Sequence, residues 1–271
     1  ILCDNAPFFE GEIFSEQGLT TPHELIKTRE WTWENMIKIA RSATRDLSGD
    51  GEINQWGFDR LLIANPEILS LIFASNGLTF FERKDTQYKL GFTKPEGIAL
   101  LKKFQQFYSD KFYPSQPANN LRAFFNGKTA MALGIWYTFE YFRNHNIEVG
   151  LAGLPYGGDK KQSSLFTYGE EVTLLPITAE KPKALLEVYN YLYPPEEMED
   201  MINQRISNLK TDKYSKQLAK KLAQNWKVLD EHNFELLQKT KIQIQQFLDN
   251  KISPEMLSER LKRKAMDYIE K

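Results

Sequence analysis

Apolar side chains recur three or four residues apart in two stretches of the first half of the chain, the spacing that gives a helix one apolar face. The pattern predicts a helix over residues 33–43, with Thr32 as its N-cap. It predicts another within residues 93–110, where Thr93 and Glu96 stand in the register of a capping box. Both helices are therefore expected to bury one face in a core.

The second half of the chain carries the same spacing more often. A helix over residues 181–192 is expected to end at Pro194, and one over residues 253–270 to begin at Ser253. From Thr211 onward the sequence is highly charged and amphipathic. This last part of the chain is therefore predicted to consist of helices alone.

Two apolar runs that end at glycine or proline, residues 147–155 and 170–178, predict short strands. Residues 156–169 between them are rich in turn residues and predict an exposed loop. Strands thus mix with helices in the first two thirds of the chain, and helices fill the last third. This order predicts an α/β fold with a helical C-terminal third.

Composition excludes several classes of partner. Apolar residues make up 41% of the 271 residues and charged residues 26%, a balance typical of a globular protein. The chain has 35 Lys and Arg residues against 36 Asp and Glu residues, so it lacks the large positive charge that would attract nucleic acid or an anionic bilayer. Cys3 is the one cysteine, so no internal disulfide forms. The Leu2-Cys3 pair raises a lipoprotein interpretation, but a processed lipid acceptor would be residue one, and an ordinary cysteine is preferred.

The stretch "DLSGDGEINQWGF" has the oxygen spacing of a calcium-binding loop. The candidate metal ligands, at loop positions one, three, five, seven and nine, are Asp46, Ser48, Asp50, Glu52 and Asn54. Position twelve, where a bidentate carboxylate is expected, is Gly57, and a strand rather than a second helix is predicted to follow. Bound calcium and an Asp-Gly turn that leads into a strand both stay open, and the missing carboxylate favours the turn.

Sequence motifs for catalysis are absent. The three histidines lie far apart in no ligand spacing, and no nucleophile elbow, P-loop, dinucleotide-binding or zinc-protease motif occurs. The adjacent Glu170 and Glu171 would supply an acid to a carbohydrate-active hydrolase, but their adjacency does not define the separation that such an enzyme needs. We therefore expect a protein that is not an enzyme and keep the hydrolase as a competing hypothesis.

Six stretches in fixed order resemble one protein family. They are "FFEGEIFSEQGLTTPHEL", "WTWENMIKIARSAT", the Asp-Gly loop, "AFFNGKTAMALGIWYTF", "VGLAGLPYGGDKKQSSLFTYGEEVTLLP" and "IQQFLDNKISPEMLSERLKRK". Together they resemble the extracellular solute-binding proteins of ABC importers, in the carbohydrate-binding branch related to the maltodextrin-binding protein. The fourth stretch is the most specific, and the resemblance spans nearly the whole chain.

The resemblance implies a periplasmic-binding-protein-like (type II) two-lobe α/β fold, here mainly the C-terminal lobe. Residues 1–165 are expected to form the first part of that lobe, residues 166–205 to contribute to the N-terminal lobe or the hinge, and residues 206–271 to close the structure as helices. Members of the family normally begin with about a hundred further residues, so we expect the chain to be a fragment of a larger protein.

The resemblance also implies a function: capture of a sugar or oligosaccharide outside the cell or in the periplasm, and its delivery to a membrane permease by a monomer. By resemblance, Trp136 is the cleft-facing ring on which a sugar stacks, and Tyr168 is an aromatic residue of the other lobe. Asn76, Arg60 and Glu170 are the polar candidates for sugar hydroxyls, although Asn76 before Gly77 also suits a helix end. No cofactor is expected apart from the calcium considered above. A third hypothesis makes residues 211–271 a helical protein-interaction module.

Overall fold

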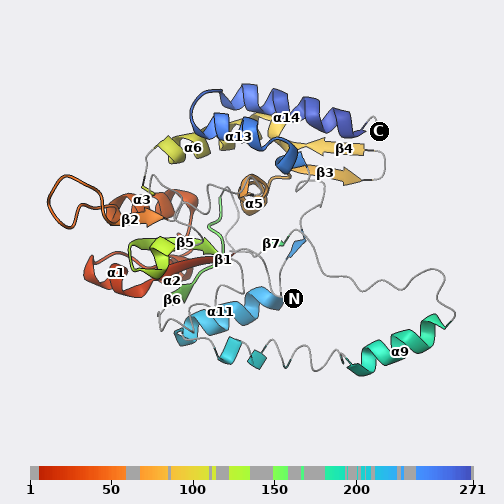
Figure 1. Ribbon diagram of the computed structural model, residues 1–271, viewed down its shortest axis with the longest axis horizontal. Coiled ribbons are helices and arrows are strands. Elements are labelled where there is room, and N and C mark those ends of the chain that lie inside the picture. The colour runs from red at the N-terminus through yellow and green to blue at the C-terminus, as the bar shows by residue number, and fades with distance from the viewer. Residues whose placement is uncertain are drawn as a thin grey trace.

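A mixed β-sheet with helices around it forms one part of the structure, and a layer of helices with a two-stranded sheet lies beside it (Figure 1). The computed structural model describes residues 6–58, 68–84, 87–109, 112–113, 122–134, 149–157, 166–167, 181–192, 194, 200, 203–204, 206–208, 211–224, 227–228 and 236–269. The predicted strand at 170–178 lies outside these residues. The predicted domain boundaries stay a prediction.

The four-stranded sheet gathers strands from distant parts of the chain. Its order is β2 (Trp56–Phe58), β5 (Thr129–Gly134), β1 (Ala6–Glu10) and β6 (Val149–Leu151). Strand β1 runs antiparallel to both β5 and β6, whereas β2 runs parallel to β5. Residues 129–133 of β5 are all buried, as expected for a strand covered on both faces. The strand predicted within residues 147–155 is confirmed as β6.

Short helices lie against this sheet. They are α1 (Gly11–Glu16), α2 (Pro22–Thr28), α3 (Trp33–Ala43), α7 (Arg122–Phe125) and α11 (Lys213–Gln224). Helix α3 has the predicted bounds, and the Thr32 hydroxyl accepts a hydrogen bond from the Asn35 backbone N–H at 3.3 Å. Helix α2 begins with a complete capping box between Thr21 and Glu24. Local side-chain caps therefore decide where these helices start.

The neighbouring layer is built on α6. Its elements are α5 (Ile68–Ser75), β3 (Phe81–Lys84), β4 (Gln87–Leu90), the 3₁₀ turn η1 (Gly91–Thr93), α6 (Pro95–Ser109), α13 (Lys241–Leu248) and α14 (Pro254–Ile269). The Gln105 amide donates to the carbonyls of Phe247 at 2.8 Å and Ile252 at 2.9 Å, which ties the turn between α13 and α14 to α6. Ser253 caps α14 as predicted, accepting from the Met256 N–H.

Two sequence-based expectations are wrong in detail. The helix predicted from residue 93 begins at Pro95, because residues 91–93 form the 3₁₀ turn and the Thr93 hydroxyl donates to the Leu90 carbonyl instead of forming a capping box. The region after Thr211 is not helical throughout, because β8 (Lys227–Val228) pairs in parallel with β7 (Phe166–Thr167). Strand β8 forms because it pairs with a distant strand, so the helical pattern of the local sequence could not reveal it.

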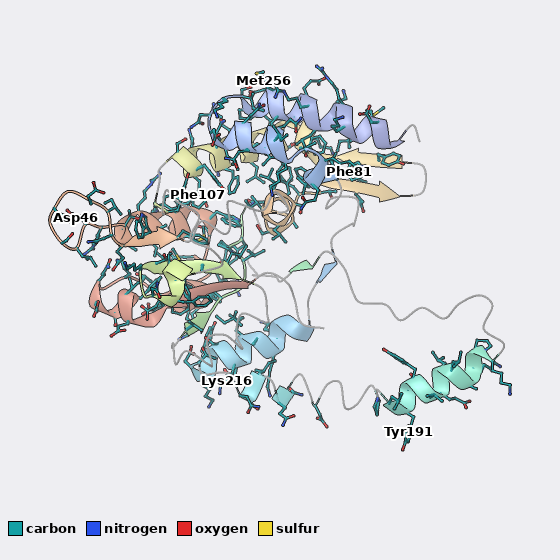
Figure 2. All side chains as sticks on the ribbon, viewed as in Figure 1. Asp46, Phe81, Phe107, Tyr191, Lys216 and Met256 are labelled. Carbon is teal, nitrogen blue, oxygen red and sulfur yellow. The ribbon has the colours of Figure 1, made fainter. Side chains whose placement is uncertain are left out.

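Helix α9 (Pro182–Leu192) forms where the sequence predicts it, but no residue of it is buried. Leu186, Val188 and Leu192 are 52%, 55% and 61% exposed. Figure 1 shows α9 well apart from both the sheet and the α6 layer, and Figure 2 shows Tyr191 on it, far from the other labelled side chains. The apolar face of this helix therefore covers nothing in the described part of the chain.

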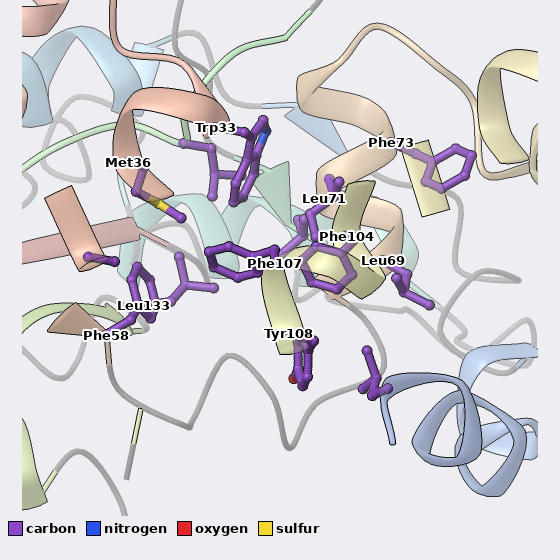
Figure 3. Packing of buried hydrophobic residues seen from close by; sticks show 14 of the residues in the cluster. Trp33, Met36, Phe58, Leu69, Leu71, Phe73, Phe104, Phe107, Tyr108 and Leu133 are labelled. Carbon is purple, nitrogen blue, oxygen red and sulfur yellow. The ribbon is translucent and has the colours of Figure 1, made fainter. Parts of the chain in front are cut away.

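Two tryptophans at the start of α3 bind it to the sheet and to the neighbouring layer. Trp31 is fully buried, and its indole N–H donates to the Gly153 carbonyl at 2.7 Å. The Trp33 indole N–H donates to the Ser75 hydroxyl at 2.9 Å, which links α3 to the end of α5. Figure 3 shows Trp33 from α3 among the buried residues of the core, with Phe107 of α6 beside it. Both tryptophans therefore anchor the start of α3 in the core.

Glycine at position 57 is required by the contact between β2 and α3. A β-carbon on Gly57 would lie 1.9 Å from the Ala40 carbonyl oxygen. We expect Gly57→Ala to lower the free energy of unfolding by about 1–3 kcal/mol, because the strand has to move away from the helix. Urea denaturation measures the change. Gly11→Ala is the matched control, since no atom lies within 4 Å of its added β-carbon. Equal stability of the two variants would contradict the close approach.

Candidate functional site

Four of the five residues predicted to contact a sugar, Trp136, Tyr168, Arg60 and Glu170, lie outside the described residues. Three of them closely follow a described strand in the sequence. Arg60 stands two residues after the end of β2, and Trp136 stands two residues after the end of β5. Tyr168 directly follows β7. Because β2 and β5 are parallel, their carboxyl ends meet at one edge of the sheet. Cys3 and Glu171 also lie outside the described residues.

Asn76 terminates helix α5. Its backbone N–H bonds to the carbonyls of Ile72 and Phe73, and its side-chain amide donates to the Ile72 carbonyl at 2.8 Å. Gly77 follows with a φ of 80°, the left-handed conformation that ends many helices. The helix-end interpretation of Asn76 is confirmed. Its predicted sugar contact stays a prediction, with one amide hydrogen already used inside the protein.

Side-chain oxygens hold the Asp-Gly loop together. The Asp46 carboxylate accepts hydrogen bonds from the backbone N–H groups of Gly49 and Gly51, each at 2.7 Å. The Asn54 amide donates to the Ser48 hydroxyl at 2.8 Å, and its oxygen accepts from the Leu47 N–H. The Gly51 hydrogen bond, followed by that of Gly49, lowers the pKa of Asp46 below its ordinary value. The side chains of the loop thus satisfy several of its own backbone groups. The loop projects beyond α3 and β2 (Figure 2).

The loop is followed by strand β2, as predicted, and not by a second helix. Position twelve of the calcium pattern is Gly57, whose close contact with Ala40 leaves no room for a carboxylate side chain. Among the described residues, no group of three or more His, Cys, Asp or Glu side chains is placed to hold a metal ion. These findings support the turn, and calcium binding by Asp46, Ser48, Asp50, Glu52 and Asn54 stays a prediction.

Asp46→Asn tests the two interpretations of the loop. An amide offers one acceptor oxygen where the carboxylate offers two, so we expect this variant to lower Tm, with no change when millimolar calcium is added to either protein. Differential scanning calorimetry gives both values. If calcium raises Tm of the wild type and this rise is lost in Asp46→Asn, the loop is a calcium site.

A histidine, a serine and an aspartate meet where α2 and α11 contact the edge strand β6. The His23 Nε2 lies 2.7 Å from the Leu151 carbonyl oxygen and 3.3 Å from the Ser215 hydroxyl. Ser215 is fully buried, donates to an Asp212 carboxylate oxygen at 2.6 Å, and accepts from the Leu151 N–H at 2.9 Å. The serine proton is therefore directed at Asp212 and not at the histidine. This cluster binds two helices to a strand, and it lacks the proton path of a catalytic triad.

Burial lowers the pKa of His23, against the opposing effects of the Leu151 carbonyl and the Asp212 charge. The ring is enclosed by Phe9 and Tyr214, whose centroids lie 4.8 Å and 4.5 Å away. Burial by itself would raise the pKa of Asp212, but hydrogen bonds from the Ser215 side chain and backbone outweigh it and lower the pKa. At neutral pH the cluster therefore holds a neutral imidazole beside an ionised carboxylate.

The lowered pKa values of His23 and Asp212 predict that the protein loses stability in mild acid. The folded protein keeps His23 neutral at pH values at which the unfolded chain takes up a proton, so the free energy of unfolding falls as pH drops below about 6.5, the ordinary histidine value. His23→Gln should reduce this dependence, because glutamine does not titrate. Thermal unfolding of both proteins between pH 7.5 and 5 measures it, and parallel curves would rule out the contribution.

Helices α3, α5 and α6 enclose a groove of about 340 Å³. It is lined by Trp33, Glu34, Ile37, Lys38, Arg41, Ile72, Asn76, Leu100, Lys103, Phe104, Gln106 and Phe107. At its mouth, the Lys103 ammonium lies 2.9 Å from the Glu34 carboxylate and joins α3 to α6. Partial burial would raise the pKa of Glu34, but the hydrogen bond and charge of Lys103 help to hold the pKa below its ordinary value. Asn76, the predicted sugar residue that the structure describes, lines this groove.

Comparison with solved structures shows what this chain is similar to. An ABC substrate-binding protein from Listeria monocytogenes, in complex with cycloalternan, is 15% identical with a TM-score of 0.67, and the match covers 98% of this chain and 69% of that one. The maltose/maltodextrin-binding domain from Bdellovibrio bacteriovorus, bound to maltotriose, is 16% identical with a TM-score of 0.65, over 100% and 73% of the chains. The cyclic alpha-maltosyl-1,6-maltose binding protein from Arthrobacter globiformis is 13% identical with a TM-score of 0.70, over 98% and 70%.

The chain has the fold of ABC solute-binding proteins. The predicted class, an α/β periplasmic-binding-protein-like fold, is therefore confirmed. No protein-family model and no curated protein matches the chain, so the solute-binding-protein fold rests on the structural likeness. These three structural neighbours are named as binding proteins and not as enzymes. None of the helices in the described part of the chain combines the length and apolar character needed to span a membrane.

Proposed function

We propose that this protein is the substrate-binding component of an ABC transporter, which captures a carbohydrate outside the cell and delivers it to a membrane permease. The observation that carries the proposal is the fold, which the chain shares along 97–100% of its length with proteins such as those that hold cycloalternan and maltotriose. In this proposal the protein works as a monomer and catalyses no reaction.

The sheet supports a location for the ligand. Ligands of open α/β sheets bind outside the carboxyl ends of parallel strands. Strands β2 and β5 end at one such edge, and the sequence that follows them supplies Arg60 and Trp136. We assign Trp136 to stacking on a pyranose face, where an indole buries a large apolar area, and Arg60 to hydrogen bonds with hydroxyls.

Tyr168 and Glu170 follow β7, a strand of the separate β7–β8 pair. In the proposal they contact the sugar from a second side: the Tyr168 ring stacks on the sugar ring, and the Glu170 carboxylate accepts hydrogen bonds from the sugar hydroxyls. Asn76 offers its remaining amide hydrogen. A ligand held by residues that follow two separate sheets is suited to a hinge motion that closes one part of the protein on the other.

The other hypotheses receive less support. The C-terminal helices α13 and α14 pack against α6 through Gln105, which favours their being part of the same fold over a separate interaction module. The hydrolase hypothesis rests on Glu170 or Glu171, which lie outside the described residues, and the solved structures reported above are named as binding proteins. Incubation with maltotriose and detection of new reducing ends would separate hydrolysis from binding.

Binding of maltotriose tests the proposal. A ligand at a hundred times its Kd stabilises a protein by about 2.7 kcal/mol, so a sugar-dependent rise in Tm is expected. Isothermal titration calorimetry should show that Trp136→Ala weakens binding about tenfold or more through loss of the stacked ring. Tyr191→Ala is the control, because Tyr191 is an aromatic residue that is 84% exposed on α9.

The proposal fails if no sugar in a panel of maltose, maltotriose, cyclodextrin and common monosaccharides binds the folded protein. Equal weakening by Trp136→Ala and Tyr191→Ala would reject the assignment of the site while keeping sugar binding. Retained binding with new reducing ends would favour the hydrolase.

A further inference from the structure

Strand β6 forms one edge of the four-stranded sheet and pairs there with β1. Successive residues of a strand point their backbone groups to opposite sides, so residues 149 and 151 share one side and Gly150 points to the other. The Leu151 N–H and C=O both bond to side chains that lie outside the sheet, so residues 149 and 151 face outward. An outward-facing edge can pair with a further strand unless other groups cover it.

Three side chains occupy the place that a further strand would take. The Leu151 N–H donates to the Ser215 hydroxyl at 2.9 Å, and the Leu151 carbonyl accepts from the His23 Nε2 at 2.7 Å. The Thr211 hydroxyl donates to the Val149 carbonyl. These contacts satisfy both backbone groups of Leu151 and the carbonyl of Val149, so no strand pairs with this edge while they are in place.

Two of these side chains come from the start of helix α11, which lies along β6 (Figure 1). In residues 213–221 of this helix, whose burial the structure describes, the buried side chains are those of Ser215 and Ala219, and both are small. Tyr214 and Leu218 are half-buried. Segments with few buried apolar contacts open at a lower free energy than the core of a sheet. We therefore expect the start of α11 to leave β6 more readily than the sheet unfolds.

The edge that α11 covers is complementary to itself. When two β6 strands meet antiparallel with Gly150 opposite Gly150, Val149 of each copy stands opposite Leu151 of the other. Both residues face outward, so each such pair can exchange two N–H···O=C hydrogen bonds. The same short segment then serves both copies, and the contact closes as a dimer about a two-fold axis.

We propose that the outer edge of β6 is a strand-addition site for a second copy of this chain, which His23, Thr211 and Ser215 keep closed in the monomer. Release of the start of α11 opens the site, and two copies then join their sheets through β6. A strand of three residues buries much less than the roughly 1,200 Å² of a stable interface, so this association is weak. The inference does not depend on carbohydrate binding and goes beyond the proposed function.

The double variant Thr211→Val/Ser215→Ala tests the site, because it removes both hydroxyls with little change in volume. At about 5 µM protein we expect its Leu151 amide to exchange hydrogen about tenfold faster than in the wild type, since the amide has lost its acceptor. At about 500 µM a dimer should form and slow this exchange again, while the wild type stays monomeric. Residue-resolved hydrogen exchange and sedimentation velocity measure both effects.

Thr28→Val/Ser109→Ala is the matched control. It removes the same two hydroxyls from exposed positions at the ends of α2 and α6. Its Leu151 amide should exchange within about twofold of the wild-type rate, and the protein should stay monomeric at both concentrations. Slow exchange at the amides of the buried strand β5 shows in each variant that the sheet is folded.

Val149→Pro, added to the double variant, tests the contact itself. The N–H that proline lacks faces away from β1, so the pairing of β6 with β1 is kept, while the ring obstructs a strand on the outer side. We expect the dimer to disappear and the Leu151 amide to exchange rapidly at both concentrations.

The wild-type protein tests the opening of α11. Its Leu151 amide should exchange about tenfold faster or more than the amides of β5, because release of the helix requires less free energy than unfolding of the sheet. Equal rates would mean that α11 leaves only when the sheet unfolds, and would overturn its role as a separate cover.

The remaining outcomes are equally decisive. Unchanged exchange at Leu151 in the double variant would overturn the role of the two hydroxyls. Rapid exchange without a dimer at about 500 µM would reject the second copy as the partner. Slow exchange restored in a monomer would assign the edge to a strand of the same chain, and a dimer that survives Val149→Pro would place the contact elsewhere, for example on α9.

Discussion

The structure depends on strand β5 being paired on both edges. Strand β1, from the start of the chain, occupies one edge, and β2 occupies the other in parallel orientation. Helices α3 and α7 pack against the same strand, and its residues 129–133 are buried. Burial on both faces means that the backbone groups of β5 have no alternative partner in water, so loss of either neighbouring strand would leave buried N–H and C=O groups unpaired. Because β2 and β5 run in the same direction, the segments that follow them leave the sheet at the same edge.

Sequence patterns predicted those parts of the fold that depend on neighbouring residues. Thr32 and Ser253 cap helices because their hydroxyls reach backbone N–H groups three residues on. Thr93 forms no such cap, because it belongs to a 3₁₀ turn in which its hydroxyl donates to the Leu90 carbonyl. The pairing of β7 with β8, about sixty residues apart, left no local signal in either segment. Patterns of three or four residues thus define helix ends, while the partners of short strands depend on the whole chain.

The site was less predictable than the fold. Motif order pointed to Trp136, yet nothing in the sequence joined His23 to Ser215, which lie 192 residues apart and meet through strand β6. The groove was missed for another reason. The apolar stripes of α3 and α6 were expected to be buried entirely, and Lys38 resembles any solvent-exposed charge on a helix. The relative position of α3 and α6, which the Glu34–Lys103 ion pair bridges at the surface, brings apolar side chains of both helices together beside Lys38.

Helix α9 has eleven residues and no buried side chain. Helices of that length are marginal in water on their own, because nucleation is costly and packing normally supplies most of their stability. With no side chain buried, α9 receives little of this packing stabilisation from the described part of the chain. Anything that covers its leucines would order it at the same time, and the entropy lost in that ordering would subtract from the affinity. A partner that covered α9 would thus bind it and fold it in one step.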